Sequence, residues 1–195
     1  SLEDALEIIV ARGKAMEEAQ EGAMLSVNMA KEEAEAYIQN NDRLTLAVIN
    51  SAQDMVLSGP VDAVALAEKE LTQNDLLCRK VHVARAFHSP MMDDAAKHFV
   101  SSIEHIKFSP PVIPLVSNVS GTWITENQAI DARYWGRHMR NTVRFADNLW
   151  TILDESPEVL MEVGSHTILG QLATKIVKQG GQEQQTSILS CLQHP

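Results

Sequence analysis

The chain lacks several features that would point to a class of protein at once. It has only two cysteines, Cys78 and Cys191, which lie far apart in the sequence. This spacing indicates neither a disulfide framework nor a cysteine-based zinc site. No apolar run approaches the roughly 18 residues of a membrane-spanning helix, and no signal peptide is evident. We therefore expect a cytoplasmic location and no membrane partner.

Basic residues are also scarce. Lys and Arg total 16 against 26 Asp and Glu, and the net charge is −10. Nucleic-acid-binding domains normally present a basic face, so this balance argues against nucleic acid as a partner. There is no G-x-x-x-x-G-K-[ST] phosphate loop, and the seven histidines show no metal-ligand spacing. We expect no bound metal or cofactor.

The remaining composition is that of an ordinary globular domain. Hydrophobic residues make up 45% of the chain and charged residues 22%, and 195 residues can bury a sizeable core. Ser1 to Asp4 has the pattern of a helix capping box and lacks an initiating Met. We expect a piece of a longer polypeptide, with an essential part upstream.

The first expected helix runs from about Leu2 to Glu18, with apolar residues in a broad arc that should face the core. Arg12 falls inside this arc. Because an unpaired buried charge is costly, Arg12 needs an anionic partner. Either an ion pair within the fold or a substrate carboxylate, gripped by the planar guanidinium, would supply one.

Residues 22–85 are interpreted as a compact insert. The expected elements follow the order β-α-β-β-α-β of a ferredoxin-like unit. Their ranges are 23–29, 31–39, 44–49, 55–58, 61–71 and 76–83. Asn50 lies in the turn between the two middle strands, where it either holds its own backbone or contacts a substrate.

The stretch from Val83 to Asp93 is a junction between two rigid elements. A β-branched run ends at Val83, Ser89 offers an N-cap oxygen, and Pro90 suits the first position of a helix. His88 is therefore the last residue before a capped helix. A histidine in this place is either a general base or a structural or surface residue.

The C-terminal part contains a proline-rich segment and then a basic, aromatic one. Val112 to Val116 is expected to be a strand, and Tyr134–Phe145 to open a helix. Arg137, Arg140 and Arg144 form a local basic cluster on an acidic chain. They either pack the domain or meet an acidic carrier protein or a CoA phosphate.

Several stretches resemble motifs of the malonyl/acyl transferase family, and especially of the acyltransferase domains of type I modular polyketide synthases. They follow one another along the chain in the same order as the family's motifs. Ala-Phe-His-Ser-Pro at 86–90 resembles the motif of the catalytic histidine. The other stretches are Arg12-Gly13, Asn50-Ser51 with Val56–Gly59, Val116–Gly121, Tyr134–Phe145 and Glu162–Leu169. Ser165 departs from the last motif, which usually has proline there.

The resemblance implies an α/β fold and a set of roles. Residues 1–21 and 86–195 would form part of an α/β-hydrolase-like large subdomain, and 22–85 the ferredoxin-like small one. His88 would be the general base, and a backbone carbonyl of Asn118 would hold its second ring nitrogen. Arg12 would bind the malonyl carboxylate, with Phe87 and Asn50 also at the substrate.

The family's nucleophile is a serine in a G-x-S-x-G elbow, and no such motif occurs in these 195 residues. The resemblance therefore covers only the C-terminal two-thirds of the domain. We expect the isolated chain to be inactive and its incomplete sheet to expose an edge and apolar area.

The resemblance also implies the substrate and the partners. The acyl group would pass from a CoA thioester to the phosphopantetheine thiol of an acyl carrier protein. Ketosynthase and other synthase domains would be neighbours, together with the missing N-terminal part. Phe87 resembles the malonyl-selecting version of its motif, although Arg85 departs from it. The alternatives are a fatty-acid malonyl-CoA:carrier-protein transacylase and a non-catalytic remnant that acts as a docking domain.

Overall fold

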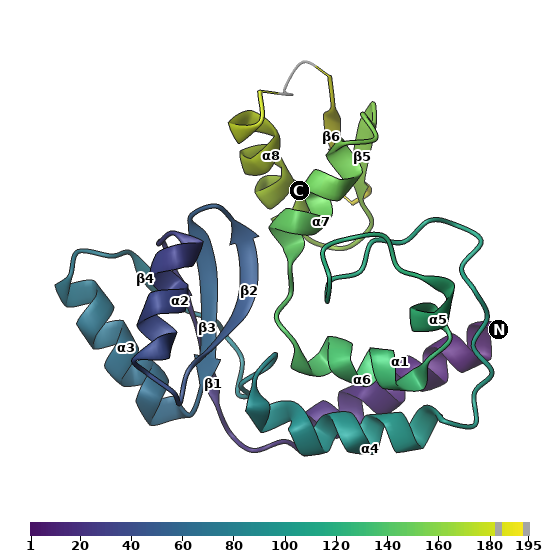
Figure 1. The fold of residues 1–195 in the computed structure, drawn as a ribbon, viewed down its shortest axis with the longest axis horizontal. Coiled ribbons are helices and arrows are strands. Elements are labelled where there is room, and N and C mark those ends of the chain that lie inside the picture. The colour runs from purple at the N-terminus through teal and green to yellow at the C-terminus, as the bar shows by residue number, and fades with distance from the viewer. Residues whose placement is uncertain (182–184, 193–195) are drawn as a thin grey trace.

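The computed structural model describes residues 1–181 and 185–192. Its elements form three groups (Figure 1). A four-stranded sheet with two helices lies on one side. A layer of helices lies beside it, and a two-stranded sheet with two further helices forms the third group.

The first group is a ferredoxin-like α+β unit. It consists of β1 (Ala23–Val27), α2 (Lys31–Gln39), β2 (Thr45–Ser51), β3 (Asp54–Gly59), α3 (Val61–Gln73) and β4 (Cys78–Lys80). The antiparallel sheet has the order β2-β3-β1-β4. The predicted β-α-β-β-α-β order is therefore confirmed, although β4 ends earlier than expected.

Alternation along the strands gives this sheet two buried faces. Leu25 and Leu57 belong to the core that also contains side chains of α2 and α3. Met24, Ala47 and Val56 belong to a separate cluster on the opposite face. The second face receives the segment that leads to His88, as described below.

The second group is built from helices. It contains α1 (Leu2–Glu17), a 3-10 turn (Pro90–Met92), α4 (Asp93–Ile103), α5 (Glu126–Ala129) and α6 (Ala132–Arg140). Ala15, Phe99, Ile103 and Met139 form its core. The predicted capping box at Ser1 is present.

The expectation that the whole apolar arc of α1 faces the core is wrong. Leu6 is 55% exposed and Ile9 is 65% exposed, and Ala15 is the buried residue of the helix. The helix packs against α4 along one side only, with Ile8, Ala11 and Met16 partly buried there. The rest of the arc is left facing outward.

The third group contains α7 (Phe145–Leu153), β5 (Val159–Glu162), α8 (Ile168–Gln179) and β6 (Ser187–Ser190). The strands β5 and β6 pair in parallel. Both helices pack against β2 and share the main core with the ferredoxin-like unit. The mixed α/β fold class is thus as predicted.

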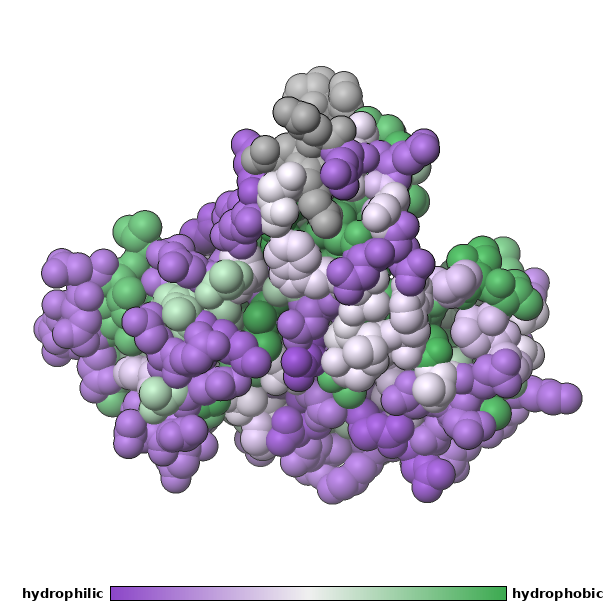
Figure 2. Space-filling view, turned by 45° about the horizontal axis from the view of Figure 1, so that its top comes forward, coloured by the Kyte–Doolittle hydropathy of each residue, from purple (hydrophilic) through white to green (hydrophobic). Residues whose placement is uncertain are grey.

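Apolar side chains remain on the surface in several places. Figure 2 shows one group of apolar residues at the right-hand end, where α1 begins and the segment after α4 runs in Figure 1, and others near the top, where β5 and β6 lie. The exposed ones include Leu2, Leu6, Ile9, Val10, Val112, Ile113, Val159, Met161 and Val163. Within residues 1–181 and 185–192, no helix combines the length and the apolar character needed to cross a membrane.

The strand expected at Val112 to Val116 does not form. Val112 is 97% exposed, and the segment contributes only an isolated bridge between Val116 and Trp123. Pro110, Pro111 and Pro114 surround these residues. Each proline lacks the N–H that hydrogen bonding to a neighbouring strand requires. The β-branched residues between the prolines therefore do not form a strand.

Gly121 gives a test of the packing between the loop 117–122 and α7. Its φ is +78°, and a Cβ there would lie 2.6 Å from the Cβ of Asp147. Left-handed backbone costs an ordinary residue about 1–2 kcal/mol, so we expect Gly121→Ala to lower the free energy of unfolding by about 2 kcal/mol or more. Chemical denaturation measures this change.

Gly13 is the matched control for this substitution. It lies within the helix α1, and a Cβ there would meet nothing within 4 Å. Alanine is favoured over glycine in a helix by about 0.5–1 kcal/mol. We therefore expect Gly13→Ala to raise the free energy of unfolding, and equal effects of the two substitutions would contradict the assignment.

Candidate active site

His88 is held between two fixed points of the backbone. The buried hydroxyl of Ser89 donates to the carbonyl of Ala86 at 2.6 Å and accepts from the backbone N–H of Met91 at 3.2 Å. Ser89 therefore caps the 3-10 turn, as predicted from the sequence. His88 itself has a φ of +57°, which costs a non-glycine residue about 1–2 kcal/mol. Strain of this kind is typical of functional positions.

The imidazole of His88 has a defined tautomer. Its Nδ1 lies 2.9 Å from the backbone carbonyl oxygen of Asn141. A carbonyl oxygen can only accept a hydrogen bond, so Nδ1 carries the proton and Nε2 carries a free lone pair. Nε2 has no hydrogen-bond partner in the part of the chain that the structure describes. This is the arrangement that a general base requires.

The predicted partner of His88 was wrong. The carbonyl of Asn118 accepts from the backbone N–H of Arg144 at 3.0 Å. The carbonyl that contacts Nδ1 of His88 is that of Asn141. Asn141 is the C-cap of α6, and the last carbonyls of a helix have no partner within the helix. The sequence analysis did not predict this helix end: it expected Tyr134–Phe145 to open a helix, whereas α6 ends at Arg140 and a second helix begins at Phe145.

The ferredoxin-like unit fixes the position of Asn141. Val143, two residues after Asn141, pairs with the edge of β2. Its backbone N–H donates to the carbonyl of Ala47 at 2.8 Å, and its carbonyl accepts from the N–H of Ile49 at 2.9 Å. The acceptor that orients His88 is therefore tied to a sheet edge rather than to a free loop.

Arg12 is a half-buried cation near this base. No carboxylate among the described residues lies within 4.0 Å of it, so the alternative of an internal ion pair is not what this part of the chain forms. Its Nη1 instead lies 3.1 Å from Nδ1 of His138. Burial lowers the pKa of Arg12, yet a guanidinium stays charged in proteins.

Burial lowers the pKa of His88 to about 4, with the charge of Arg12 acting in the same direction and the hydrogen bond to Asn141 opposing it. Arg12 is thus close enough to influence the base electrostatically. A guanidinium without a carboxylate partner, close to a neutral and oriented imidazole, is suited to pair with an anionic group.

Phe87 and Asn50 have packing partners in the structure. Phe87 packs against the sheet face formed by Met24, Ala47 and Val56, next to His88. Asn50 lies within β2 and not in the turn where it was expected, and its Nδ2 donates to the side chain of Asp54 at 3.3 Å, not to its own backbone. Contact of either residue with a substrate stays a prediction.

The three arginines of the basic cluster do not form an open cationic patch. Each lies beside an aspartate, and the pairs are Arg137–Asp131 at 3.4 Å, Arg140–Asp93 at 2.5 Å and Arg144–Asp147 at 2.6 Å. Their contact with a carrier protein or CoA stays a prediction and would have to compete with these pairs.

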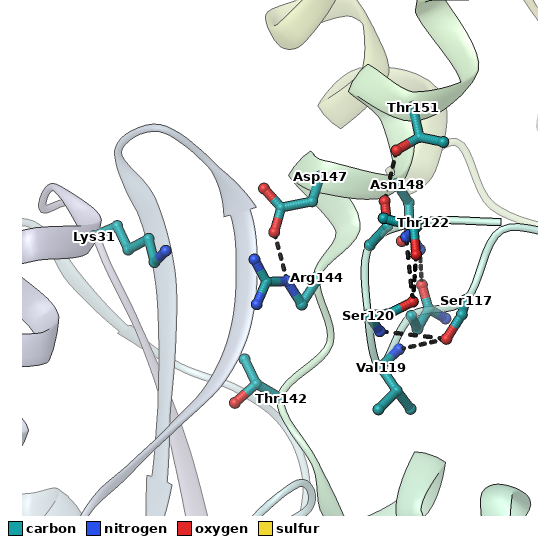
Figure 3. A network of polar contacts seen from close by, with 12 residues as sticks. Lys31, Ser117, Val119, Ser120, Thr122, Thr142, Arg144, Asp147, Asn148 and Thr151 are labelled. Atoms are coloured by element: carbon teal, nitrogen blue, oxygen red, sulfur yellow. Dashed lines mark hydrogen bonds and ion pairs between the residues drawn. The ribbon is translucent and has the colours of Figure 1, made fainter. Parts of the chain in front are cut away.

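The loop that carries Asn118 is fastened to α7 (Figure 3). The hydroxyl of Ser117 accepts from the N–H groups of Val119 and Ser120 at 3.1 and 3.3 Å. The hydroxyl of Thr151 donates to the carbonyl of Gly121 at 2.6 Å. These bonds fix the backbone on both sides of Asn118, whose side chain faces His138.

The mixed α/β fold thus holds an oriented, neutral histidine close to an arginine that has no carboxylate partner among the described residues. The chain belongs to the acyl transferase domain family, whose model matches residues 1–194.

The relatives are large synthases, and the chain matches a small part of each. The chain is 33% identical over 165 residues to mycoketide-CoA synthase of Mycobacterium tuberculosis, covering 84% of this chain and 4% of that protein. It is 30% identical over 171 residues to polyketide synthase GfsB of Streptomyces halstedii, covering 87% of this chain and 3% of that protein.

A solved structure supports the same family. The acyltransferase domain from the second module of the salinomycin polyketide synthase is 32% identical and matches with a TM-score of 0.90 over 99% of this chain. The match covers 45% of that solved chain. This chain thus spans less than half of that chain and only a small part of each of the two synthases.

Proposed function

We propose that this chain supplies the base and the carboxylate-binding residue of a polyketide synthase acyltransferase, which in its complete form moves malonyl groups from CoA to an acyl carrier protein. The observation that carries the proposal is the pair formed by His88, with Nε2 free, and Arg12, with no carboxylate partner in the described residues. Transfer from a thioester to a thiol requires a base, and the free carboxylate of malonyl requires a cation.

In the proposed mechanism, Nε2 of His88 takes the proton of a serine hydroxyl as that oxygen attacks the CoA thioester. The protonated imidazole then returns the proton to the departing CoA thiolate, which leaves a malonyl-serine ester. The phosphopantetheine thiol attacks this ester next, and His88 removes the thiol proton and gives it back to the serine oxygen. Throughout, Nδ1–H stays hydrogen-bonded to Asn141.

Arg12 keeps the malonyl carboxylate paired in every step. With Nη1 facing His138, the guanidinium retains other N–H donors for the two carboxylate oxygens. This contact fixes the acyl group relative to His88 and disfavours acyl groups without a carboxylate.

The serine and the oxyanion-stabilising donors come, in this proposal, from the preceding part of the domain, because the 195 residues contain no G-x-S-x-G. Neighbouring ketosynthase and other synthase domains and a carrier protein are the expected partners.

The direct test is transfer of radiolabelled malonyl from CoA to the carrier protein by the full-length protein that contains this chain. We expect transfer by the full-length protein and no covalent label on the isolated chain. A full-length protein that transfers nothing would favour the docking-domain alternative. Equal transfer to a free fatty-acid carrier protein would favour the fatty-acid transacylase.

Phe87 should contribute to the choice of extender unit. A bulky ring next to His88 occupies space that an α-methyl branch would need, and one methyl group is worth about 1–3 kcal/mol of discrimination. We expect Phe87→Ser to reduce the preference for malonyl-CoA over methylmalonyl-CoA by about tenfold or more. Competition between the two thioesters measures the ratio, and an unchanged ratio would remove Phe87 from the account.

The lowered pKa of His88 predicts an unusual pH profile. A base must be neutral to act, and a pKa of about 4 keeps His88 neutral well below the range of an ordinary histidine. We expect kcat/KM to remain nearly constant from pH 7 down to about 5.5. A histidine with the ordinary pKa of about 6.5 would lose roughly tenfold over that interval, and such a loss would contradict the assigned environment.

A further inference from the structure

We propose that His138 is a positioning residue, a neutral imidazole that holds the guanidinium of Arg12 in place without neutralising its charge. This inference rests on the proposed function of Arg12 and adds the residue that prepares it. His138 lies on α6, where its ring is half-buried beside Trp135, with ring centroids 6.1 Å apart. Its Nδ1 is 3.1 Å from Nη1 of Arg12.

The protonation of His138 follows from its two neighbours. A guanidinium can only donate, so Nδ1 must accept from Arg12, and the proton of the neutral ring must be on Nε2. The side-chain amide of Asn118 lies 3.3 Å from Nε2. The atom placed there is Nδ2, but an N–H at Nε2 needs an acceptor. Because the two ends of an amide are distinguished only by their partners, we assign the oxygen of Asn118, and not Nδ2, to the side that faces the ring.

The contacts of Asn148 require the same orientation of the Asn118 amide. With its oxygen toward His138, Asn118 offers its NH₂ group to Asn148, whose side-chain oxygen accepts. The NH₂ group of Asn148 then donates to the backbone carbonyls of Ser117 at 2.9 Å and Arg144 at 3.2 Å. In the opposite orientation, the oxygen of Asn148 would face two carbonyl oxygens.

One direction of donation is therefore consistent with each contact in the series from Nη1 of Arg12 to the backbone carbonyls of Ser117 and Arg144. Donors lie at the Arg12 end and acceptors at the backbone end, so the imidazole of His138 is locked in one tautomer. Burial is the largest cause that lowers the pKa of His138, to about 4, and the charges of Arg12 and His88 act in the same direction. The ring stays neutral at physiological pH.

A neutral acceptor suits a cation that must bind an anion. A carboxylate at position 138 would hold Arg12 equally well but would pair with its charge and compete with the malonyl carboxylate. An apolar side chain would leave Arg12 free to adopt other rotamers, and ordering it would then weaken binding. His138 avoids both outcomes.

The test uses the full-length protein with malonyl-CoA and with acetyl-CoA, which lacks the carboxylate. For His138→Leu we expect KM for malonyl-CoA to rise about tenfold, with kcat changed less than threefold and with acetyl transfer changed less than twofold. His138→Asn offers an amide oxygen close to the place of Nδ1 and should recover most of the lost affinity. His138→Asp should raise KM for malonyl-CoA by about 30-fold or more.

Exposed His105 is the control, because it pairs only with Glu7 on the surface of α1 among the described residues. His105→Leu should leave both thioesters unaffected. Parallel losses for malonyl and acetyl transfer in His138→Leu, an unchanged KM, or failure of His138→Asn to recover affinity would each overturn the proposal.

A second measurement separates this proposal from the proposed function. If the full-length wild type transferred no acyl group, the proposed function would fail. Calorimetric titration with malonyl-CoA would still test His138, because a tenfold weaker affinity of His138→Leu than of His138→Asn requires no turnover. Equal affinities of these two variants would overturn the role of His138 alone.

Discussion

Replacing His88 with alanine in the full-length protein should lower the rate of malonyl transfer by about 10³-fold or more. Each half of the proposed reaction needs Nε2 once to take a proton and once to return it, and the hydrogen bond from Nδ1 to Asn141 keeps the lone pair on Nε2. The measurement is the initial rate of malonyl loading onto the carrier protein, followed by mass spectrometry.

The control for this loss is His166, an exposed residue in the loop before α8 that contacts the hydroxyl of Ser165 at 2.9 Å. The sequence makes it an attractive second base, but His166→Ala should keep the wild-type rate within about twofold. Undiminished transfer in His88→Ala would mean that the motif at 86–90 does not mark the base.

His88→Gly separates catalysis from folding. Glycine adopts the left-handed backbone of position 88 without the penalty of about 1–2 kcal/mol that the histidine bears. The glycine variant should therefore be as inactive as the alanine variant and at least as stable toward denaturant. A histidine that served the fold would show the reverse, with stability lost and activity largely kept.

The parts of this fold that sequence analysis predicted are those set by local signals. The helix Lys31–Gln39 was predicted with its observed bounds, and Ser89 caps the turn after His88 as expected. Capping side chains and hydrophobic periodicity act over a few residues, so they can be read without knowing the neighbours in space.

The parts that were missed depend on contacts between distant segments. The acceptor for His88 is a backbone carbonyl, and every residue has one, so side-chain chemistry did not single out Asn141. The exposure of apolar residues on α1 likewise depends on which elements pack against the helix. The apolar pattern of the helix does not contain that information. His138 was missed although Tyr134, His138 and Asn141 recur at helical spacing, a signal that they face the same way.

Arg12→Ala should have the second large effect, and it should be selective. Losing a hydrogen-bonded charge partner in a buried site costs about 2–5 kcal/mol, or roughly 30- to several thousand-fold in kcat/KM. We expect a loss in this range for malonyl-CoA and little change for acetyl-CoA. The preference for malonyl-CoA over acetyl-CoA should therefore disappear or reverse. Competition assays with both thioesters measure the ratio.

Two further variants, Arg12→Lys and the control Arg79→Ala, complete this test. Lysine keeps the charge but loses the planar fork, so its malonyl activity should lie between those of the wild type and the alanine variant. Arg79 is an exposed arginine on β4 and should have no effect on the ratio. Equal losses for malonyl-CoA and acetyl-CoA in Arg12→Ala would show that Arg12 acts on the fold instead.

The stability of Arg12→Ala provides an independent test of the same residue. Within the described residues, Arg12 makes no ion pair, and its one side-chain hydrogen bond goes to His138. Removing a half-buried charge that lacks a carboxylate partner relieves desolvation as it loses that bond, so the free energy of unfolding should change by less than about 1 kcal/mol. A change this small would support the proposal that Arg12 serves to bind an anion, and a large loss of stability would count against it.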